Sequence, residues 1–406
     1  MSHKSAKNNS VASADKQRSS RALHFVLLIG VVSLFADWTY EGARSITGQF
    51  LAVLGTSAAV VATVAGLGEL LGYGLRIVSG RLSERTQKFW PITLFGYVIQ
   101  MASVPLLALA PNWKLAALLI LTERIGKATR NPPRDVMLSH ATEEMGYGWG
   151  FGLHEALDQI GALVGPLVVA VVIARHGNYR EAFALLLVPA LITLALLVAA
   201  RISYPNPEEL AKPSTQTATA GYSRAFWIYL VAAILVAAGF ADFQLIAFHF
   251  QKAESFRAAW IPILYAIAMG VSGAGSLVFG RLFDRLGIGV LVPLTIVTAL
   301  FAPLVFLGGF WAAVLGSALW GLGMGVHESI VPAAVAGFVS AQRRPSAYGI
   351  FTGVYGIAWF AGSAIMGLLY DRSVVDAVVF CLVVQLAAVP VLLAVRKSAA
   401  GGSQAI

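Results

Sequence analysis

The sequence predicts an all-α integral membrane protein with about twelve transmembrane helices in two similar bundles of six. Three observations predict this fold class: an apolar composition, apolar stretches of membrane-spanning length, and an internal repeat. Of the 406 residues, 58% are hydrophobic and 12% are charged, and the mean hydropathy is +0.75. These values are far from those of a water-soluble domain, so water is not the main solvent of this chain.

Apolar stretches bounded by charged residues, Pro and Gly recur along the whole chain. Several approach the roughly 20 residues that a helix needs to cross a hydrocarbon core about 30 Å thick. A helix satisfies its own backbone hydrogen bonds at that depth. We therefore predict helices over residues 23–43, 57–80, 90–109, 114–138, 149–174, 181–201, 224–248, 258–280, 288–307, 311–338, 347–368 and 374–395. The stretch 288–307 contains Pro293 and Pro303, which interrupt it.

The distribution of Lys and Arg predicts the orientation. Most of them gather in the N-terminal segment, in alternate loops and after the last predicted helix, on one side of the membrane. Fewer fall on the other side, among them Arg175, Lys252 and Arg257. The positive-inside rule assigns that side to the cytoplasm. We therefore expect a multi-pass protein of the inner (cell) membrane with both termini cytoplasmic. The net charge of +9 then reflects this bias and not binding to nucleic acid.

A hydrophilic stretch near the midpoint divides the chain. We expect a disordered cytoplasmic N-tail (1–22), an N-terminal bundle (23–201), a cytoplasmic linker (202–223), a C-terminal bundle (224–396) and a cytoplasmic C-tail (397–406). The single cysteine, Cys381, lies inside the last predicted helix, which excludes disulfides and CxxC chemistry.

Two segments recur at matching points of the two halves. The segment 80–85 (GRLSER) recurs as 280–285 (GRLFDR), and 35–38 (FADW) recurs as 240–243 (FADF). Similar segments in the same order indicate an internally duplicated transporter.

These segments resemble the major facilitator superfamily, whose loop signature follows the second helix of each half. The segment Gly161-Ala-Leu-Val-Gly165-Pro166 is similar to the GxxxGP element of the drug/proton antiporters of that family. The resemblance implies two rocking bundles and a cytoplasmic latch that forms when the cavity faces outward. Its residues would be Gly80, Arg81, Glu84, Arg85, Gly280, Arg281, Asp284 and Arg285. The alternative is that these are ordinary loop charges.

Ionisable residues inside the predicted helices are the strongest functional signal, because an unpaired charge there costs on the order of 3 kcal/mol or more. They line either a buried ion-pair network or a water-filled cavity, and they are denser in the first half. The family resemblance places helices one, four, seven and ten around the cavity. Its candidate polar groups are then Asp37, Glu41, Arg124, Lys127, Asp242 and Glu328.

The fifth predicted helix carries His154-Glu155-Ala-Leu-Asp158, which lacks the second His of an HExxH zinc site. We therefore expect no metal there, and interpret His154 and Asp158 as a proton-sensitive pair. Asp37 and Glu41, one helical turn apart, are predicted to share the transported proton, with Glu155 and Asp158 as the next candidates.

We predict a secondary transporter and not an enzyme, most simply a proton-coupled exporter of a small amphiphilic compound that acts as a monomer without cofactors. One alternative is a proton-coupled importer of a metabolite or metal chelate, and another is a membrane receptor or enzyme without transport. The charge of the substrate stays open, because cations would favour Asp37 and Glu41, whereas anions would favour Arg124, Lys127 and Arg130.

Overall fold

The computed structural model describes residues 2–142, 147–206, 222–254, 256–327, 334–335 and 344–402. Within these ranges it describes no side chain for residues 2–19, 142, 147–152, 284, 344–346 and 397–402. The described chain is helical and contains no strand, which confirms the predicted fold class. Most of the expected linker lies outside the described residues.

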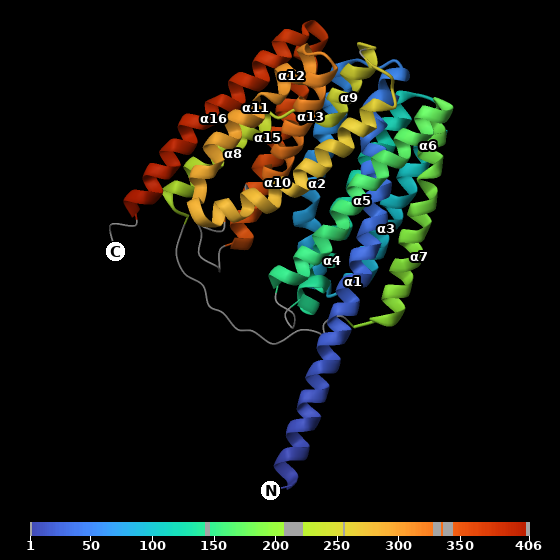
Figure 1. Cartoon of the computed structure of the whole chain (residues 1–406), viewed down its shortest axis with the longest axis vertical. Helices are drawn as coiled ribbons and strands as arrows, with labels where there is room; N and C mark the ends of the chain where they lie inside the picture. Colours follow the sequence, from blue (N-terminus) through green and yellow to red (C-terminus); the bar gives the residue numbers. More distant parts are fainter. Residues whose placement is uncertain are drawn as a thin grey trace.

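The N-terminal bundle consists of the helices before the linker. They are α1 (Ser2–Val53), α2 (Ala58–Thr86), α3 (Phe89–Leu106), η1 (Leu107–Leu109), α4 (Trp113–Thr142), α5 (Tyr147–His176), α6 (Tyr179–Leu185) and α7 (Leu187–Ser203). Residues 2–22, expected as a tail, form the start of α1, which projects from the body of the molecule (Figure 1).

The C-terminal bundle consists of the helices after the linker. They are α8 (Arg224–Ala238), α9 (Phe243–Lys252), α10 (Trp260–Leu286), η3 (Gly287–Val290), α11 (Leu291–Ala299), α12 (Phe301–Leu307), α13 (Phe310–Gly325), α15 (Arg344–Arg372) and α16 (Val374–Gly402). The two bundles lie side by side, the first in blue to green and the second in yellow to red (Figure 1).

In the described part of the chain, 10 helical segments are long and apolar enough to cross a membrane. Two further helices complete the expected layout. The apolar helix α13 is shorter, and α4 has the length but carries charged residues from Glu123 to Asp135.

The predicted helix at 288–307 is interrupted, as expected. It is divided into η3, α11 and α12, with the last break at Leu300, just before Pro303. The helix predicted over 224–248 is present as one membrane-spanning segment, Arg224–Lys252, but the chain unwinds inside it, between α8 and α9. No proline lies at this break. The freed carbonyls of Gly239 and Ala241 accept hydrogen bonds from the side chains of Gln385 and Trp320.

Glycines allow a close approach between the first and fifth membrane-spanning helices of each bundle, which are α1 and α5 in the first bundle and α8 and α15 in the second. A Cβ atom added to Gly161 of α5 would lie 2.1 Å from the Leu34 carbonyl oxygen, and one added to Gly362 of α15 would lie 2.1 Å from that of Ala238. Any larger residue would force these helices apart. The same device in both bundles is the structural counterpart of the sequence repeat.

The two bundles touch at one end of the molecule, which we name the Asp371 end. There the Asp371 carboxylate of α15 accepts hydrogen bonds from the backbone N–H groups of Ala58 and Ala59, at 2.9 Å each. The contact between α2 and α15 continues inward to Tyr73, which lies beside Gly356. These contacts join the first turn of α2 to the last turn of α15.

The bundles separate toward the opposite end, which we name the loop-signature end because residues 80–85 and 280–285 lie there. A Cβ atom added to Gly74 of α2, or to Gly349 or Gly353 of α15, would have no neighbour within 4 Å. The same holds for Gly280 at the end of α10. The two bundles are therefore in contact at the Asp371 end, and these glycines show no such contact at the other.

Candidate functional site

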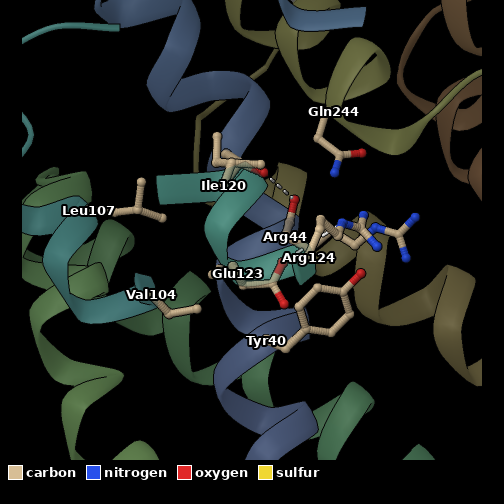
Figure 2. A pocket seen from close by; sticks show the side chains of 10 residues that line it. Tyr40, Arg44, Val104, Leu107, Ile120, Glu123, Arg124 and Gln244 are labelled. Atoms are coloured by element: carbon tan, nitrogen blue, oxygen red, sulfur yellow. Dashed lines mark hydrogen bonds and ion pairs between the residues drawn. The ribbon is translucent and has the colours of Figure 1, made fainter. Parts of the chain in front are cut away.

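A cavity lies inside the N-terminal bundle where that bundle meets α9 (Figure 2). Its empty volume, with the open side included, is about 290 Å³. Tyr40 and Arg44 of α1, together with Glu123 and Arg124 of α4, supply most of its polar atoms. Gln244 of α9 faces them from the other bundle, so the cavity has walls from both halves.

Glu69 of α2 joins the two arginines of this cavity. Its Oε1 atom lies 3.3 Å from a terminal nitrogen of Arg44 and 2.9 Å from one of Arg124. Arg44 donates a hydrogen bond to this oxygen, but the approach of Arg124 lacks hydrogen-bond geometry. All three side chains are buried, so the network is shielded from solvent screening.

The Tyr40 ring is surrounded by cationic groups. The Lys127 ammonium nitrogen lies 3.7 Å from the ring centroid, and the guanidinium carbons of Arg124 and Arg44 lie 5.1 and 5.9 Å from it. The face of an aromatic ring carries partial negative charge, which stabilises nearby cations. One ring thus helps to hold three positive charges close together.

Glu41 lies at the contact between the bundles. It accepts a hydrogen bond from the Tyr265 hydroxyl of α10 and lies 3.9 Å from Arg44. This carboxylate is buried and belongs to the predicted cavity set. Its environment therefore depends on how the two bundles sit against each other.

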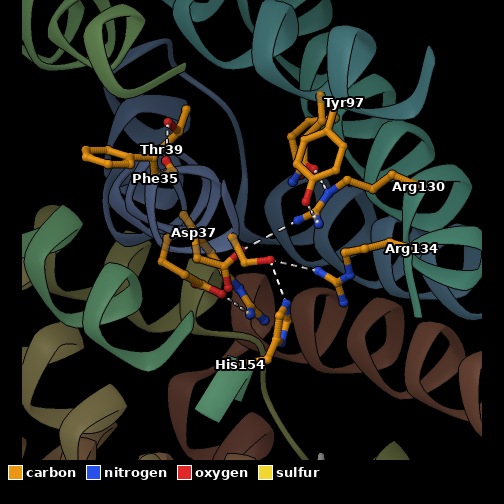
Figure 3. A network of polar contacts seen from close by, with 12 residues as sticks. Phe35, Asp37, Thr39, Tyr97, Arg130, Arg134 and His154 are labelled. Carbon is orange, nitrogen blue, oxygen red and sulfur yellow. Dashed lines mark hydrogen bonds and ion pairs between the residues drawn. The ribbon is translucent and has the colours of Figure 1, made fainter. Parts of the chain in front are cut away.

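Asp37 belongs to a second polar network, one turn nearer the loop-signature end (Figure 3). It lies 3.6 Å from Arg130, which donates hydrogen bonds to Tyr97 and Gln100. Gln100 in turn donates to Glu123 of the cavity at 2.8 Å. Asp37 and Glu41 thus have separate partners, and a chain of side chains connects Asp37 to the cavity.

His154 takes part in this second network through a partner other than the one predicted. Its Nε2 atom lies 2.9 Å from the Ser33 hydroxyl, which also accepts a hydrogen bond from Arg134. No hydrogen bond or ion pair joins His154 to Asp158 among the described residues, so the proton-sensitive pair stays a prediction. Residues four apart share a helix face, but whether their side chains bond depends on their tertiary partners. Ser33 of α1 is such a partner for His154.

The two carboxylates of α5 lie in different surroundings. Glu155 is exposed and accepts a hydrogen bond from Gln159. Asp158 is half-buried, and one of its oxygens has no hydrogen-bond partner among the described residues. Of the two, Asp158 has the environment that a proton-carrying group requires.

In the C-terminal bundle, Asp242 lies at the start of α9, beside the break. It accepts hydrogen bonds from Trp359 at 3.2 Å and Ser363 at 2.8 Å, and no cation pairs with it within the described ranges. Glu328, the other predicted cavity residue of this bundle, lies outside the described residues.

The loop signatures lie at the end opposite Asp371. Among the described side chains there, Glu84, Arg85 and Arg285 are exposed and form no ion pair. Asp284 is outside the described side chains, and Arg81 and Arg281 are exposed. The predicted latch belongs to the opposite conformation, so it stays a prediction.

The GxxxGP element has a packing role in α5. Gly165, like Gly161, lies against the backbone of α1, where an added Cβ would be 2.3 Å from the Trp38 carbonyl oxygen. Pro166 follows directly and is buried. This close approach explains both glycines without reference to the direction of transport.

A duplicated twelve-helix layout, with a polar cavity between its halves, defines a secondary transporter. The sequence profile described as Major Facilitator Superfamily matches residues 26–362, and the chain belongs to this family. It is a membrane transporter and not an enzyme.

Relatives and solved structures agree with this assignment. An uncharacterized protein of Mycobacterium tuberculosis is 40% identical over 383 residues, which cover 92% of this chain and 93% of that protein. An uncharacterized MFS-type transporter of Methanocaldococcus jannaschii is 26% identical over 364 residues, covering 86% of this chain and 89% of that one. The crystal structure of nucleoside transporter NupG is similar in fold, with a TM-score of 0.70, 15% identity, and coverage of 92% of this chain and 98% of that one.

Glu69, Arg44 and Glu123 are among the ionisable residues inside the predicted helices, but the predicted cavity set does not include them. Glu69 was missed because the family resemblance does not place the second helix at the cavity. Tyr40 and Tyr265 were missed because an aromatic residue in an apolar helix is usually part of the packing. The position of Tyr40 four residues before Arg44 was the available signal, since that spacing places both on one helix face.

Proposed function

We propose that this chain is a proton-coupled secondary transporter that moves a small molecule by alternating access between its bundles. The hydrogen bond from Tyr265 to Glu41 carries the proposal, because it links a buried carboxylate of α1 to a helix of the other bundle. Protonation of Glu41 removes the charge that this hydroxyl and Arg44 face. A proton at Glu41 therefore alters a contact between the bundles, and such a difference between states is what coupling requires.

Asp37 is the second carboxylate that we propose to carry the proton. Its only ion pair within the described residues is the 3.6 Å approach of Arg130, so a proton on Asp37 would free a buried guanidinium. The side chains from Arg130 through Gln100 to Glu123 connect this change to the cavity. Asp158, and less so the exposed Glu155, would take the role if Asp37 does not.

Export of a small amphiphilic compound is our first choice of direction. It rests on the similarity of Gly161, Gly165 and Pro166 to the antiporter element and on the aromatic interior of the C-terminal bundle, which suits an apolar group. The alternative is import of a metabolite or metal chelate. The three cations around Tyr40 favour that alternative, because they suit an anionic metabolite better than a cationic amphiphile.

We propose an inner-membrane location with both termini in the cytoplasm, in a protein that works as a monomer because one chain carries both bundles. The Asp371 end is then external, and the conformation described here is open to the cytoplasm. Reporter fusions after Lys88 and at the C-terminus should read cytoplasmic, and one after Pro111 should read external. A cytoplasmic reading at Pro111 would contradict this orientation.

The decisive experiment is a substrate screen in inverted and right-side-out vesicles with an imposed pH gradient. Antiport predicts that substrate moves against the proton flow, and symport predicts that it moves with it. Proton coupling is wrong if transported compounds cross at the same rate with and without the gradient. Vesicles without the protein give the background.

A further inference from the structure

The cavity contains more buried hydrogen-bond donors than acceptors. Arg124 is 6% exposed, yet it donates no hydrogen bond within the described residues. The Nε atom of Arg44 and the hydroxyl of Tyr40 also lack partners there. A guanidinium has five N–H donors, and buried donors in native proteins are nearly always satisfied. These groups are therefore arranged for an acceptor that is not part of the described chain.

The charge of that acceptor follows from its neighbours. Arg44, Arg124 and Lys127 converge on the Tyr40 ring, and Lys127 forms no ion pair or hydrogen bond within the described residues. A cationic ligand would meet three like charges in a site shielded from water, which disfavours it. A planar or tetrahedral oxyanion matches guanidinium geometry and can accept from several donors at once.

The three carboxylates present equal these cations in number but pair with them loosely. A single oxygen of Glu69 serves both arginines, while Glu123 stays 3.7 Å from Arg124 and Glu41 stays 3.9 Å from Arg44. Glu41 and Glu123 are instead bound to Tyr265 and Gln100. Glu69 is thus the group that a bound anion would displace or compete with.

We propose that this cavity binds an oxyanion group of the transported substrate, a carboxylate or a phosphate, through Arg44 and Arg124, which line it. Lys127 adds positive charge beside the Tyr40 ring. The proposal names the substrate class of the transporter proposed above and rests on that function. It applies to either direction of transport, because an exported amphiphile and an imported metabolite can both carry such a group.

The test is a binding experiment on the purified full-length protein, with benzoate and phenyl phosphate as probes. Benzamide and benzylamine serve as neutral and cationic compounds of the same shape. We expect benzoate or phenyl phosphate to raise the thermal unfolding midpoint saturably, while benzamide and benzylamine do not. The tighter of the two anions identifies the group as carboxylate or phosphate.

Variants locate the binding. Arg124→Gln should weaken anion binding about tenfold or more, since a charge-assisted hydrogen bond is lost. Arg372→Gln removes the same group from an exposed position on α15 and should leave binding unchanged. Glu69→Gln should bind the anion more tightly than the parent, because the competing carboxylate charge is gone. Tighter binding cannot result from misfolding, so Glu69→Gln tests the proposal even if Arg124→Gln does not fold.

The proposal is overturned if benzamide or benzylamine binds as tightly as the anions, if neither anion binds, or if Glu69→Gln shows no gain. These measurements need no pH gradient and no transport. Anion binding without gradient-driven transport would therefore refute the proposed function and leave this inference standing. Gradient-driven transport of neutral or cationic compounds alone would support the proposed function and refute the oxyanion site.

Discussion

The two bundles have the same fold but different interiors. In the N-terminal bundle, buried charges are held by ion pairs and hydrogen bonds, with Arg130 wholly buried between Asp37 and Gln100. In the C-terminal bundle, the corresponding space is filled by aromatic rings. Phe240 packs against Trp320 at 5.7 Å and Trp359 at 5.8 Å between ring centroids.

Duplication therefore preserved the backbone and allowed the side chains to diverge. Glycines at equivalent helix contacts, such as Gly161 and Gly362, were kept because packing of the bundle depends on them. The interior residues have no such constraint. The N-terminal bundle can consequently bind charged groups and protons, while the C-terminal bundle provides an apolar wall.

The largest expected difference concerns stability. Arg130→Ala should destabilise the protein by about 3–5 kcal/mol, because it leaves the Asp37 carboxylate buried and uncompensated. Trp359→Phe in the C-terminal bundle should cost only about 1 kcal/mol, since it removes one hydrogen bond to Asp242. Thermal unfolding in detergent measures both. Equal losses would mean that the two interiors do not differ in how they are stabilised.

A control for this prediction removes both charges. The double variant Asp37→Asn, Arg130→Gln should unfold closer to the parent than Arg130→Ala, because no unpaired charge remains. A double variant as unstable as Arg130→Ala would show that Arg130 acts by packing alone.

The second prediction uses the repeat itself, because Asp37 and Asp242 occupy the same position in FADW and FADF. Asp37→Asn should abolish pH-driven transport while substrate binding is kept, since it removes a proton acceptor next to Arg130. Asp242→Asn should slow transport only a few-fold, because Trp359 and Ser363 can still donate to an amide oxygen. Transport in vesicles with and without a pH gradient measures both variants.

Normal, equally pH-dependent transport by Asp37→Asn would make Asp37 a structural partner. The proton would then be assigned to Asp158. If Asp242→Asn loses proton coupling and Asp37→Asn keeps it, the C-terminal bundle and not the N-terminal bundle carries the proton.

How much the sequence could predict differs between fold and site. The helices follow from apolar length, because a membrane leaves the backbone few alternatives. The break between α8 and α9 could not be predicted in this way. The side chains that donate hydrogen bonds to its free carbonyls belong to Trp320 and Gln385, far along the chain. Such a compensation is tertiary and leaves no local pattern.

The charged residues of the site were visible, but their pairings were not. A charge inside an apolar helix is detectable from sequence alone. Its partner depends on the rotation of each helix, which is why Glu69 between Arg44 and Arg124 was found only in three dimensions. The same reason explains why His154 contacts Ser33 and not Asp158.

A third prediction concerns the contact between the bundles at the Asp371 end. Asp371→Ala removes a carboxylate that caps α2 from the other bundle, although Ser57 remains as the N-cap of that helix. The change should shift the conformational equilibrium by about 1 kcal/mol, several-fold in population, toward opening at that end. Labelling of Ala62→Cys by a water-soluble maleimide measures the opening, since Ala62 is buried beside Gly367 and Cys381 is buried. Asp376→Ala, which removes an exposed carboxylate of the same bundle, is the matched control. Equal labelling in both variants would show that the cap does not hold the bundles together.

The smallest effect on stability is expected at the loop signatures, where the two halves should behave alike. Arg85 and Arg285 are exposed and form no ion pair within the described side chains, so Arg85→Ala and Arg285→Ala should each change stability by less than about 0.5 kcal/mol. Both should nevertheless slow turnover, and so should Asp284→Asn, because the predicted latch forms only in the conformation that is closed at this end. Lys88→Ala, a loop charge outside the signature, should leave turnover unchanged. If the signature variants transport at the parental rate with normal expression, these residues are loop anchors. If only one of the two arginine variants slows turnover, the divergence seen in the bundle interiors extends to the loop signatures.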